Sequence, residues 1–432
     1  MNEHDALGAW RPWSLRDHLA AGDPAASRAR AEQRYREVDP QVLAWVERTP
    51  VTEPEPAGPL AGAPLGVKDV VDLAGVPTRC GSALRADAPP ATEDAAIVAA
   101  WRKAGAVPVG KTVTTEFAYF SPGPTRNPAR LGHTPGGSSS GSAAAVASGQ
   151  VPVAIGAQTA GSVTRPAAYC GVASLVMTPG RFPTRGVVGL SPTLDAHGVF
   201  TATVADLAHA FAALDGRPDG PPVPALPRRV LLWHPHGIGD VDVEMTAAVD
   251  RVAHLLTERG VEVDALHAGD RDRELVAAHL TVMAFEAARE RPAEVAATDR
   301  LSEPLAALLR RGAGLHDEEH LAALAAADRH RRDLLDLLAT YDAVIGPAAL
   351  GPAPAGLRAT GDPVLSRPWQ VLGLPTVGIP GLRSAEGLPL GLQAVGAPGR
   401  EERLLATAGG VESVVQAHAR PAHPEPARGG AR

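Results

Sequence analysis

Apolar and polar positions follow two different periods along this chain, and each period predicts a different kind of element. In its first half, short apolar runs predict strands at 64–73, 106–110 and 151–157. The stretches 92–106 and 140–149 instead carry helix-type patterns, the first with an N-cap signal. This alternation of strands and helices favours an α/β fold in which helices cover a sheet.

The N-terminal segment 1–60 is predicted to be a helical cap followed by a Pro-rich connector. A helix at 15–22 follows Ser14, and a second one at 25–38 opens after Asp23-Pro24. The second helix is expected to stop before Asp39-Pro40, because proline disfavours continuation of a helix.

Residues 61–418 are expected to form a single domain. Within it, 220–335 is expected to be a variable helical insertion, because an Ala/Leu/Arg-rich helical pattern dominates its second half. Strand-type runs return after residue 341 and precede a last helix at 401–419. Residues 419–432, rich in proline, glycine and arginine, are expected to be a disordered tail.

Composition narrows the class of protein. A chain of 432 residues that is 45% hydrophobic can bury a large core, and a net charge of −7 argues against direct nucleic-acid binding. Two cysteines and no paired Cys/His spacing exclude a disulfide framework and structural zinc. No apolar run approaches the roughly 18 residues of a membrane span, and the first twenty residues lack a signal-peptide pattern. We therefore expect a cytoplasmic protein with no membrane partner.

Lysine is rare in this chain, and one lysine stands inside an apolar strand pattern. Only three of the 41 basic residues are lysines: Lys68, Lys103 and Lys111. Lys68 lies in the run 64–73, where it either reaches out from a sheet edge or is buried. Burial lowers the pKa of a lysine, and arginine does not lose its proton in proteins. Lys68 is therefore a candidate neutral base.

The segment 132–149 is the richest in glycine and serine, and three interpretations compete for it. A phosphate-binding loop is disfavoured because Ser138 and Ser139 follow Gly137 where a P-loop has Lys-Ser/Thr. A nucleophile elbow of the G-x-S-x-G type matches 137–141, but no buried strand precedes it. The third interpretation is an ordinary capped helix start.

A second segment, 156–171, places small residues directly after a buried-type strand. The backbone N–H groups of Thr159, Ala160, Gly161 and Ser162 could converge on one point, as in an oxyanion hole, or simply form a tight loop. Together with Lys68, these serines suggest a serine hydrolase of the Ser-Lys kind. The S-x-x-K pattern of β-lactamases is absent around all three lysines.

Three segments in this order, 66–78, 135–149 and 158–171, resemble the amidase signature family. The resemblance implies one compact α/β/α domain with a large mixed central sheet, and hydrolysis of the C–N bond of a small carboxamide through an acyl-enzyme. It assigns Ser162 as the nucleophile, Ser138 as the bridging cis-serine and Lys68 as the base of a triad, with residues 159–162 as the oxyanion hole. No cofactor and no metal are implied; His316 and His320, four residues apart, are expected on a solvated helix face.

The residues after Ser162 depart from the usual family pattern. Val163 and Thr164 precede Arg165, a variant similar to malonamidase-like members, and this similarity implies that Arg165 binds a substrate carboxylate. The alternative role of Arg165 is an ion pair with a protein carboxylate. Gly136 and Gly137 are assigned to substrate binding as well.

Two other functions stay open. One is the A-type subunit of a glutamine-dependent tRNA amidotransferase, which shares the triad but works within a complex. The other is a non-catalytic binding protein on the same scaffold. The oligomeric state is also open, with a homodimer as one option.

Overall fold

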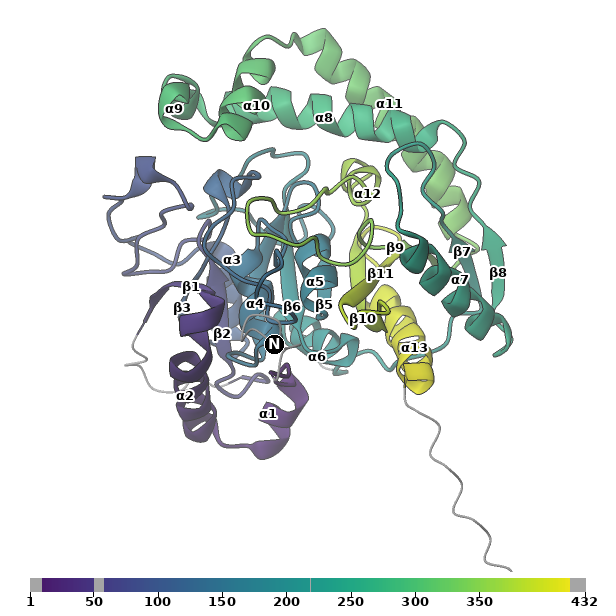
Figure 1. Cartoon of the computed structure of the whole chain (residues 1–432), viewed down its shortest axis with the longest axis horizontal. Coiled ribbons are helices and arrows are strands. Elements are labelled where there is room, and N and C mark those ends of the chain that lie inside the picture. Colours follow the sequence, from purple (N-terminus) through teal and green to yellow (C-terminus); the bar gives the residue numbers. More distant parts are fainter. Residues whose placement is uncertain (1–9, 50–57, 218, 420–432) are drawn as a thin grey trace, which may run out of the picture.

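The chain is built around one mixed sheet of eleven strands, and the computed structural model describes residues 10–49, 58–217 and 219–419 (Figure 1). The strand order is β1-β3-β2-β4-β6-β5-β10-β11-β9-β7-β8. Neighbours are parallel in β3-β2-β4 and in β9-β7-β8, and antiparallel elsewhere. The strands are β1 (Trp45–Arg48), β2 (Pro64–Lys68), β3 (Val107–Thr112), β4 (Val153–Gln158), β5 (Ala173–Val176), β6 (Ala196–Thr201), β7 (Arg229–Leu232), β8 (Glu262–Ala265), β9 (Ala343–Pro347), β10 (Thr376–Arg383) and β11 (Pro389–Val395).

Helices cover both faces of this sheet, which confirms the predicted fold class. The short helices α4 and α5 pack together on one face, and α6 packs with α1, α3 and α13 on the other. The helices are α1 (Leu15–Ala21), α2 (Pro24–Val42), α3 (Ala96–Lys103), α4 (Ser140–Ala147), α5 (Thr164–Cys170), α6 (Val204–Leu214), α7 (Val243–Thr257), α8 (Arg271–Glu290), α9 (Pro292–Val295), α10 (Glu303–Ala313), α11 (Asp317–Leu338), α12 (Arg367–Val371) and α13 (Glu401–Ala419).

The strand β4 shows why the sheet carries a core on each face. Its side chains alternate between the faces, so Val153 and Ile155 join one buried cluster while Ala154 joins the other. Helix α4 lies very close to its neighbours because it is built from small residues. A Cβ on Gly141 would lie 2.2 Å from the carbonyl oxygen of Ala44, so only glycine fits there.

The N-terminal part differs from the sequence prediction in two respects. Helix α2 does not stop before Asp39 but continues through Pro40 to Val42. One proline removes one helical hydrogen bond, and that loss does not end the helix here. The Asp39 carboxylate closes the helix by accepting the N–H of Ala44 at 2.7 Å. The N-terminal segment also contains a strand that was not predicted: Trp45–Arg48 pairs with β3 at the edge of the sheet. This strand is too short and too charged to be recognised from its pattern of apolar and polar residues.

Other predicted segments fall partly outside the described residues. The first five residues of the Pro-rich connector 53–64, and all but the first residue of the tail 419–432, belong to this group. The segment 220–335 contains β7 and β8 of the central sheet as well as the helices α7 to α11. Within the described ranges, no helix combines the length and apolar character that crossing a membrane requires.

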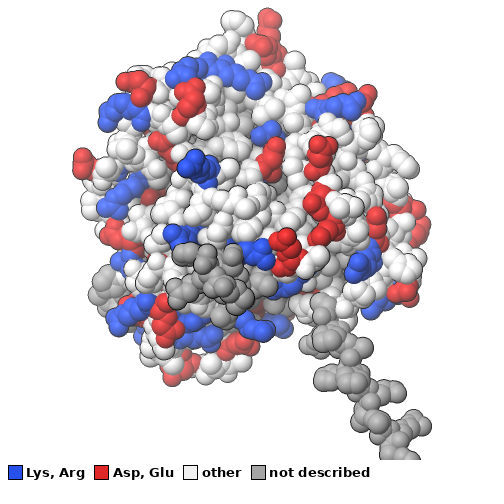
Figure 2. Space-filling view, viewed as in Figure 1, with Lys and Arg blue, Asp and Glu red and all other residues white. Residues whose placement is uncertain are grey.

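Figure 1 shows α8, α10 and α11 together above the sheet, and α8 packs against both other helices. These helices matter for function because α8 reaches the cavity described below. On the face shown in Figure 2, positive and negative side chains are interspersed. That face therefore offers no continuous basic area of the kind that follows a nucleic-acid backbone.

Candidate active site

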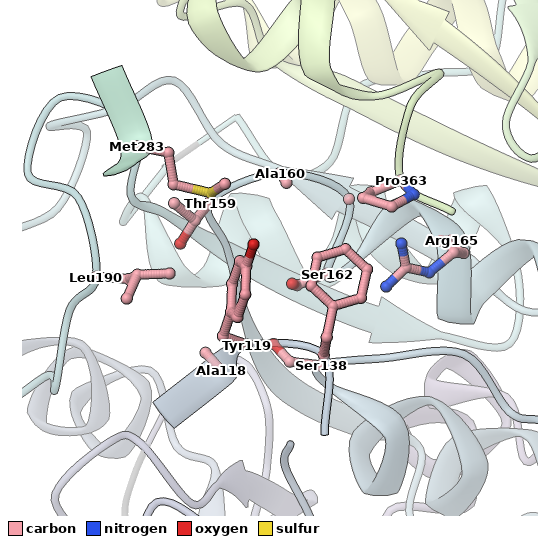
Figure 3. Close-up of a pocket in the computed structure, with 12 residues that line it drawn as sticks. Ala118, Tyr119, Ser138, Thr159, Ala160, Ser162, Arg165, Leu190, Met283 and Pro363 are labelled. Atoms are coloured by element: carbon pink, nitrogen blue, oxygen red, sulfur yellow. The ribbon is translucent and has the colours of Figure 1, made fainter. Parts of the chain in front are cut away.

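A small cavity lies beyond the end of β4, with about 310 Å³ of space not filled by atoms (Figure 3). It is bordered by the residues that follow β4, by the loop before α4, and by one residue of α8. Six of the predicted site residues line it together: Ser138 from the segment 135–149, and Thr159, Ala160, Gly161, Ser162 and Arg165 from the segment 158–171. The complete lining consists of Ala118, Tyr119, Phe120, Ser138, Thr159, Ala160, Gly161, Ser162, Arg165, Leu190, Met283 and Pro363.

Lys68 ends β2 and lies beneath this cavity, fully buried. Its Nζ donates to Ser138 Oγ at 2.7 Å and to the carbonyl oxygen of Ala157 at 3.0 Å. No carboxylate of a described residue lies within ion-pair distance of this amine. Burial therefore lowers the pKa of Lys68 to about 7, although the charge of Asp195 partly opposes the shift. Near neutral pH a large part of this amine is uncharged.

The two serines are held on the same cavity by backbone contacts. The N–H of Ser139 donates to the carbonyl oxygen of Ser162 at 3.2 Å, which ties the loop before α4 to the loop after β4. The peptide bond between Gly137 and Ser138 is cis. Figure 3 shows the side chains of Ser138 and Ser162 on the cavity, below the Thr159–Ala160 backbone. Ser138, which contacts Lys68, therefore lines the same cavity as Ser162.

The backbone N–H groups of Thr159, Ala160, Gly161 and Ser162 donate to no acceptor among the described residues. The next two N–H groups, of Val163 and Thr164, are taken instead by Gln158 Oε1 at 2.9 and 3.0 Å. The loop therefore has four N–H groups without an acceptor among the described residues, all on residues that line the cavity. Such an arrangement can stabilise negative charge on a bound oxygen atom.

Arg165 is also buried, and most of its donors are unused. Its Nη2 donates to the carbonyl oxygen of Gly137 at 2.6 Å and to Thr360 Oγ1 at 3.2 Å. Its Nε and Nη1 have no hydrogen-bond partner in residues 10–49, 58–217 and 219–419. Burial lowers the pKa of this guanidinium to about 10, which leaves it charged at neutral pH. The alternative prediction is that Arg165 forms an ion pair with a protein carboxylate. No such ion pair forms among the described residues.

Gly136 and Gly137 are not part of the cavity lining. Gly136 has a φ of +80°, and a Cβ there would lie 2.8 Å from the Cα of Pro166. Gly137 contributes its carbonyl oxygen to Arg165. In this structure the two glycines let the loop approach α5 and orient Arg165, while the substrate space lies beyond them.

Half of the lining was not anticipated from the sequence. Tyr119 and Phe120 follow the buried Phe117, and Leu190, Met283 and Pro363 come from three more segments far apart in the chain. Ala118 and Phe120 adopt left-handed backbone angles, with φ of 61° and 36°, and no local sequence motif predicts these angles. These residues carry no recognisable signal because only the tertiary packing assembles them.

Histidines elsewhere do not form a metal site. The described residues contain no group of three or more His, Cys, Asp or Glu side chains that could hold a metal ion. The expectation of a solvated face for His320 is wrong: its Nε2 lies 3.0 Å from Glu286 Oε1 and its ring stacks on Phe285. The helix α11 packs on α8 there, which brings the histidine into contact with Glu286.

The sheet, its helix layers and this cavity define a known class of enzyme. A family model described as Amidase matches residues 27–405, so the chain belongs to the amidase family, as its three resembling segments predicted. The chain is accordingly an enzyme of the class that hydrolyses carbon–nitrogen bonds.

Individual relatives place the chain within that family. It is 32% identical over 412 residues to the 2-amino-5-chloromuconic acid deaminase of Comamonas testosteroni, covering 84% of each protein. It is 31% identical over 400 residues to the A-type subunit of the glutamyl-tRNA(Gln) amidotransferase of Exiguobacterium sibiricum, covering 79% of this chain and 81% of that protein. A solved structure described as an amidase is similar with a TM-score of 0.83 at 28% identity, covering 93% of this chain and 99% of that one.

Proposed function

We propose that this protein hydrolyses the C–N bond of a small carboxamide to an acid and ammonia, with Lys68, Ser138 and Ser162 as its catalytic residues. One observation carries the proposal. A fully buried lysine, with no carboxylate partner in the part of the chain that the structure describes, contacts Ser138 at 2.7 Å, and Ser138 lines the same cavity as Ser162. An uncharged amine beside a relay hydroxyl is what a weak serine nucleophile requires.

The acylation step follows from these positions. Neutral Lys68 takes the proton of Ser138 while Ser138 Oγ takes the proton of Ser162, because a hydroxyl donates and accepts at once. Ser162 Oγ then forms a bond to the carbonyl carbon of the amide. The oxygen of that carbonyl gains negative charge, which the N–H groups of residues 159–162 stabilise.

The second half returns the proton and frees the enzyme. The proton passes back through Ser138 to the amide nitrogen, the C–N bond breaks, and ammonia leaves an acyl ester on Ser162. A water molecule, deprotonated through the same relay, attacks the ester and releases the acid. No cofactor takes part in this sequence.

Arg165 supports a carboxylate-bearing amide as the substrate. Its charge is buried at the cavity wall, and no described residue accepts a hydrogen bond from its Nε or Nη1. Leaving a buried cation unpaired costs free energy, and a carboxylate on the substrate would remove that cost with paired hydrogen bonds.

Ammonia release from a panel of small primary amides tests the reaction itself. Wild type should release ammonia from at least one amide, and Ser162→Ala should lower kcat by about 10³-fold or more. Ser413→Ala, on α13 and remote from the cavity, is the matched control and should keep full activity. Absence of release from every amide would reject the proposal.

Arg165→Ala tests the carboxylate contact with paired substrates. Malonamate-like amides should lose about 30- to 1,000-fold in kcat/KM, the usual cost of truncating one partner of a buried charge pair. Neutral amides of equal length should lose much less. Equal losses on both substrates would show that Arg165 only supports the loop that contains Gly137.

The similarity to the A-type subunits of amidotransferases favours a second candidate, in which the same site supplies ammonia to a partner. Purification of the tagged chain from its native host distinguishes the two. Stoichiometric partner subunits, with glutamine as the only hydrolysed amide, would indicate the amidotransferase function. A monomer or homodimer that is active by itself would indicate the stand-alone amidase.

A further inference from the structure

Helix α8 lies outside the three segments that carry the family resemblance, yet one of its faces meets the proposed oxyanion loop. His279, Met283 and Glu286 are spaced by four and then three residues, so they lie on one face of the helix. Met283 lines the cavity, while the other two side chains contact the loops beside it. This face does more than close the cavity.

We propose that His279 is a positioning residue that holds the loop 159–162 in the shape needed to bind the oxyanion. The proposal deepens the proposed amidase function and rests on it. Its main observation is the hydrogen bond between His279 Nε2 and the carbonyl oxygen of Thr159, at 2.9 Å between two fully or nearly buried groups.

The hydrogen bond fixes the state of the imidazole ring. A carbonyl oxygen only accepts, so Nε2 must carry the hydrogen, and the buried Nδ1 has no partner within the described ranges. Burial, helped by the nearby charge of Arg367, lowers the pKa of His279 to about 3. The ring is therefore neutral and has one defined donor at neutral pH.

The peptide plane transmits this contact to the cavity. The Thr159 carbonyl and the Ala160 N–H belong to one rigid planar unit and point in opposite directions. Holding the carbonyl thus fixes the direction of the Ala160 N–H, one of the four N–H groups described above. A loop free to rotate this peptide would lose much of its preorganised dipole.

Thr159 is held from its other side by Asp195. Its Oγ1 donates to Asp195 Oδ1 at 2.5 Å, and Asp195 Oδ2 accepts the N–H groups of Leu190 and Ser191 at 2.7 and 3.1 Å. Ser191 in turn donates its Oγ to Glu286 Oε2 at 2.5 Å, which returns the chain of contacts to α8. Thr159 is therefore fixed at its carbonyl and its hydroxyl by groups that are both anchored on α8.

A substitution series at position 279 tests the proposal. His279→Leu removes the donor, whereas His279→Gln keeps an N–H donor near the position of Nε2. We expect kcat to fall about 10- to 100-fold in His279→Leu, below the usual cost of deleting an oxyanion donor outright, with KM within about threefold of wild type. His279→Gln should recover most of kcat. His254→Gln, with a side chain 72% exposed on α7, is the control and should match wild type.

The affinity for a boronic acid is a second measurement, and a general loss of stability does not change it. A boronic acid forms a tetrahedral adduct with a serine hydroxyl, so its affinity reports the oxyanion loop, whereas the affinity of a ground-state analogue does not. In His279→Leu the affinity for the boronic acid should fall by the same factor as kcat/KM. If that variant does not fold, Thr159→Val removes the bond to Asp195 and should weaken the boronate about threefold to tenfold.

The outcomes separate this inference from the function on which it rests. Unchanged kcat and boronate affinity in a folded His279→Leu enzyme would overturn the role of His279 and leave the amidase function standing. Equal losses in His279→Leu and His279→Gln would also overturn it, because the donor would then be irrelevant. A wild-type protein without amide hydrolysis and without boronate binding would reject the proposed function, and this inference with it.

Discussion

Two buried lysines on neighbouring strands of the sheet have opposite surroundings. Lys68 ends β2 and Lys111 stands one residue before the end of β3, and both side chains are fully buried. Lys111 Nζ lies 3.0 Å from Asp69 Oδ1 and 2.9 Å from Thr78 Oγ1. Among the residues that the structure describes, the partners of Lys68 are a hydroxyl and a carbonyl oxygen.

The comparison shows that burial alone does not make a base. Burial lowers the pKa of both lysines, but the Asp69 carboxylate opposes the shift at Lys111 and favours its charged form. At Lys68 no such partner exists among the described residues, and the pKa falls to about 7. The partner of the amine, rather than its depth, separates a structural ion pair from a candidate base.

Replacing Lys68 should produce the largest effect. Lys68→Met and Lys68→Arg should each lower kcat by about 10³- to 10⁴-fold, because neither side chain can take a proton from Ser138. Ammonia release with the best amide of the panel measures the loss. Lys103→Met changes an exposed lysine and should leave the rate unchanged. An active Lys68→Arg enzyme would contradict the role of a neutral amine.

Replacing Lys111 should affect stability instead of chemistry. Lys111→Met leaves Asp69 buried and uncompensated, so we expect a loss of about 3–5 kcal/mol in the free energy of unfolding. Urea denaturation measures this loss, and kcat per folded molecule should stay within about threefold of wild type. Adding Asp69→Leu should restore most of the stability. A full loss of kcat in folded Lys111→Met would erase the contrast between the two lysines.

A third buried group, Glu412 on α13, tests whether a shifted pKa by itself marks a functional site. Its carboxylate accepts the N–H of Val204 at 3.1 Å, remote from the cavity, and burial raises its pKa to about 7. The folded protein then binds this proton more tightly than the unfolded chain, so stability falls as pH rises from about 4.5 to 7. The free energy of unfolding of Glu412→Gln should therefore exceed that of wild type by up to about 3 kcal/mol at pH 8, and by little at pH 5.

Unfolding curves at the two pH values measure that difference, with the activity of Glu412→Gln as the internal comparison. A gain in stability with unchanged kcat would show that a large pKa shift arises from burial alone. A pH-independent effect would mean that the carboxylate is already charged at pH 5 and that its hydrogen bonds outweigh burial.

The sequence predicts the fold class and the residues around Lys68, Ser138 and Ser162 because each of them stands in a compact local pattern. Strand runs and a glycine-serine loop are readable from neighbouring residues. The edge strand 45–48 is not, since its four residues show no alternation and gain their structure from pairing with β3. His279 and Met283 are missed for a different reason. Their helical spacing is visible in the sequence, but the sequence does not show that α8 packs beside the loop 159–162.

The pH dependence of activity should give the smallest effect and the finest distinction between the lysines. With a pKa of about 7, Lys68 is mostly charged below neutral pH, so kcat/KM should fall about tenfold from its plateau at pH 6. A neutral amide is the substrate, which removes any titration of the substrate itself. Lys111→Met should keep this acid limb at the same pH, because that ammonium takes no part in the reaction. Glu412→Gln should keep the acid limb as well, although Glu412 titrates in the same pH range. If the limb shifted in Glu412→Gln, the pH dependence would come from folding instead of from Lys68.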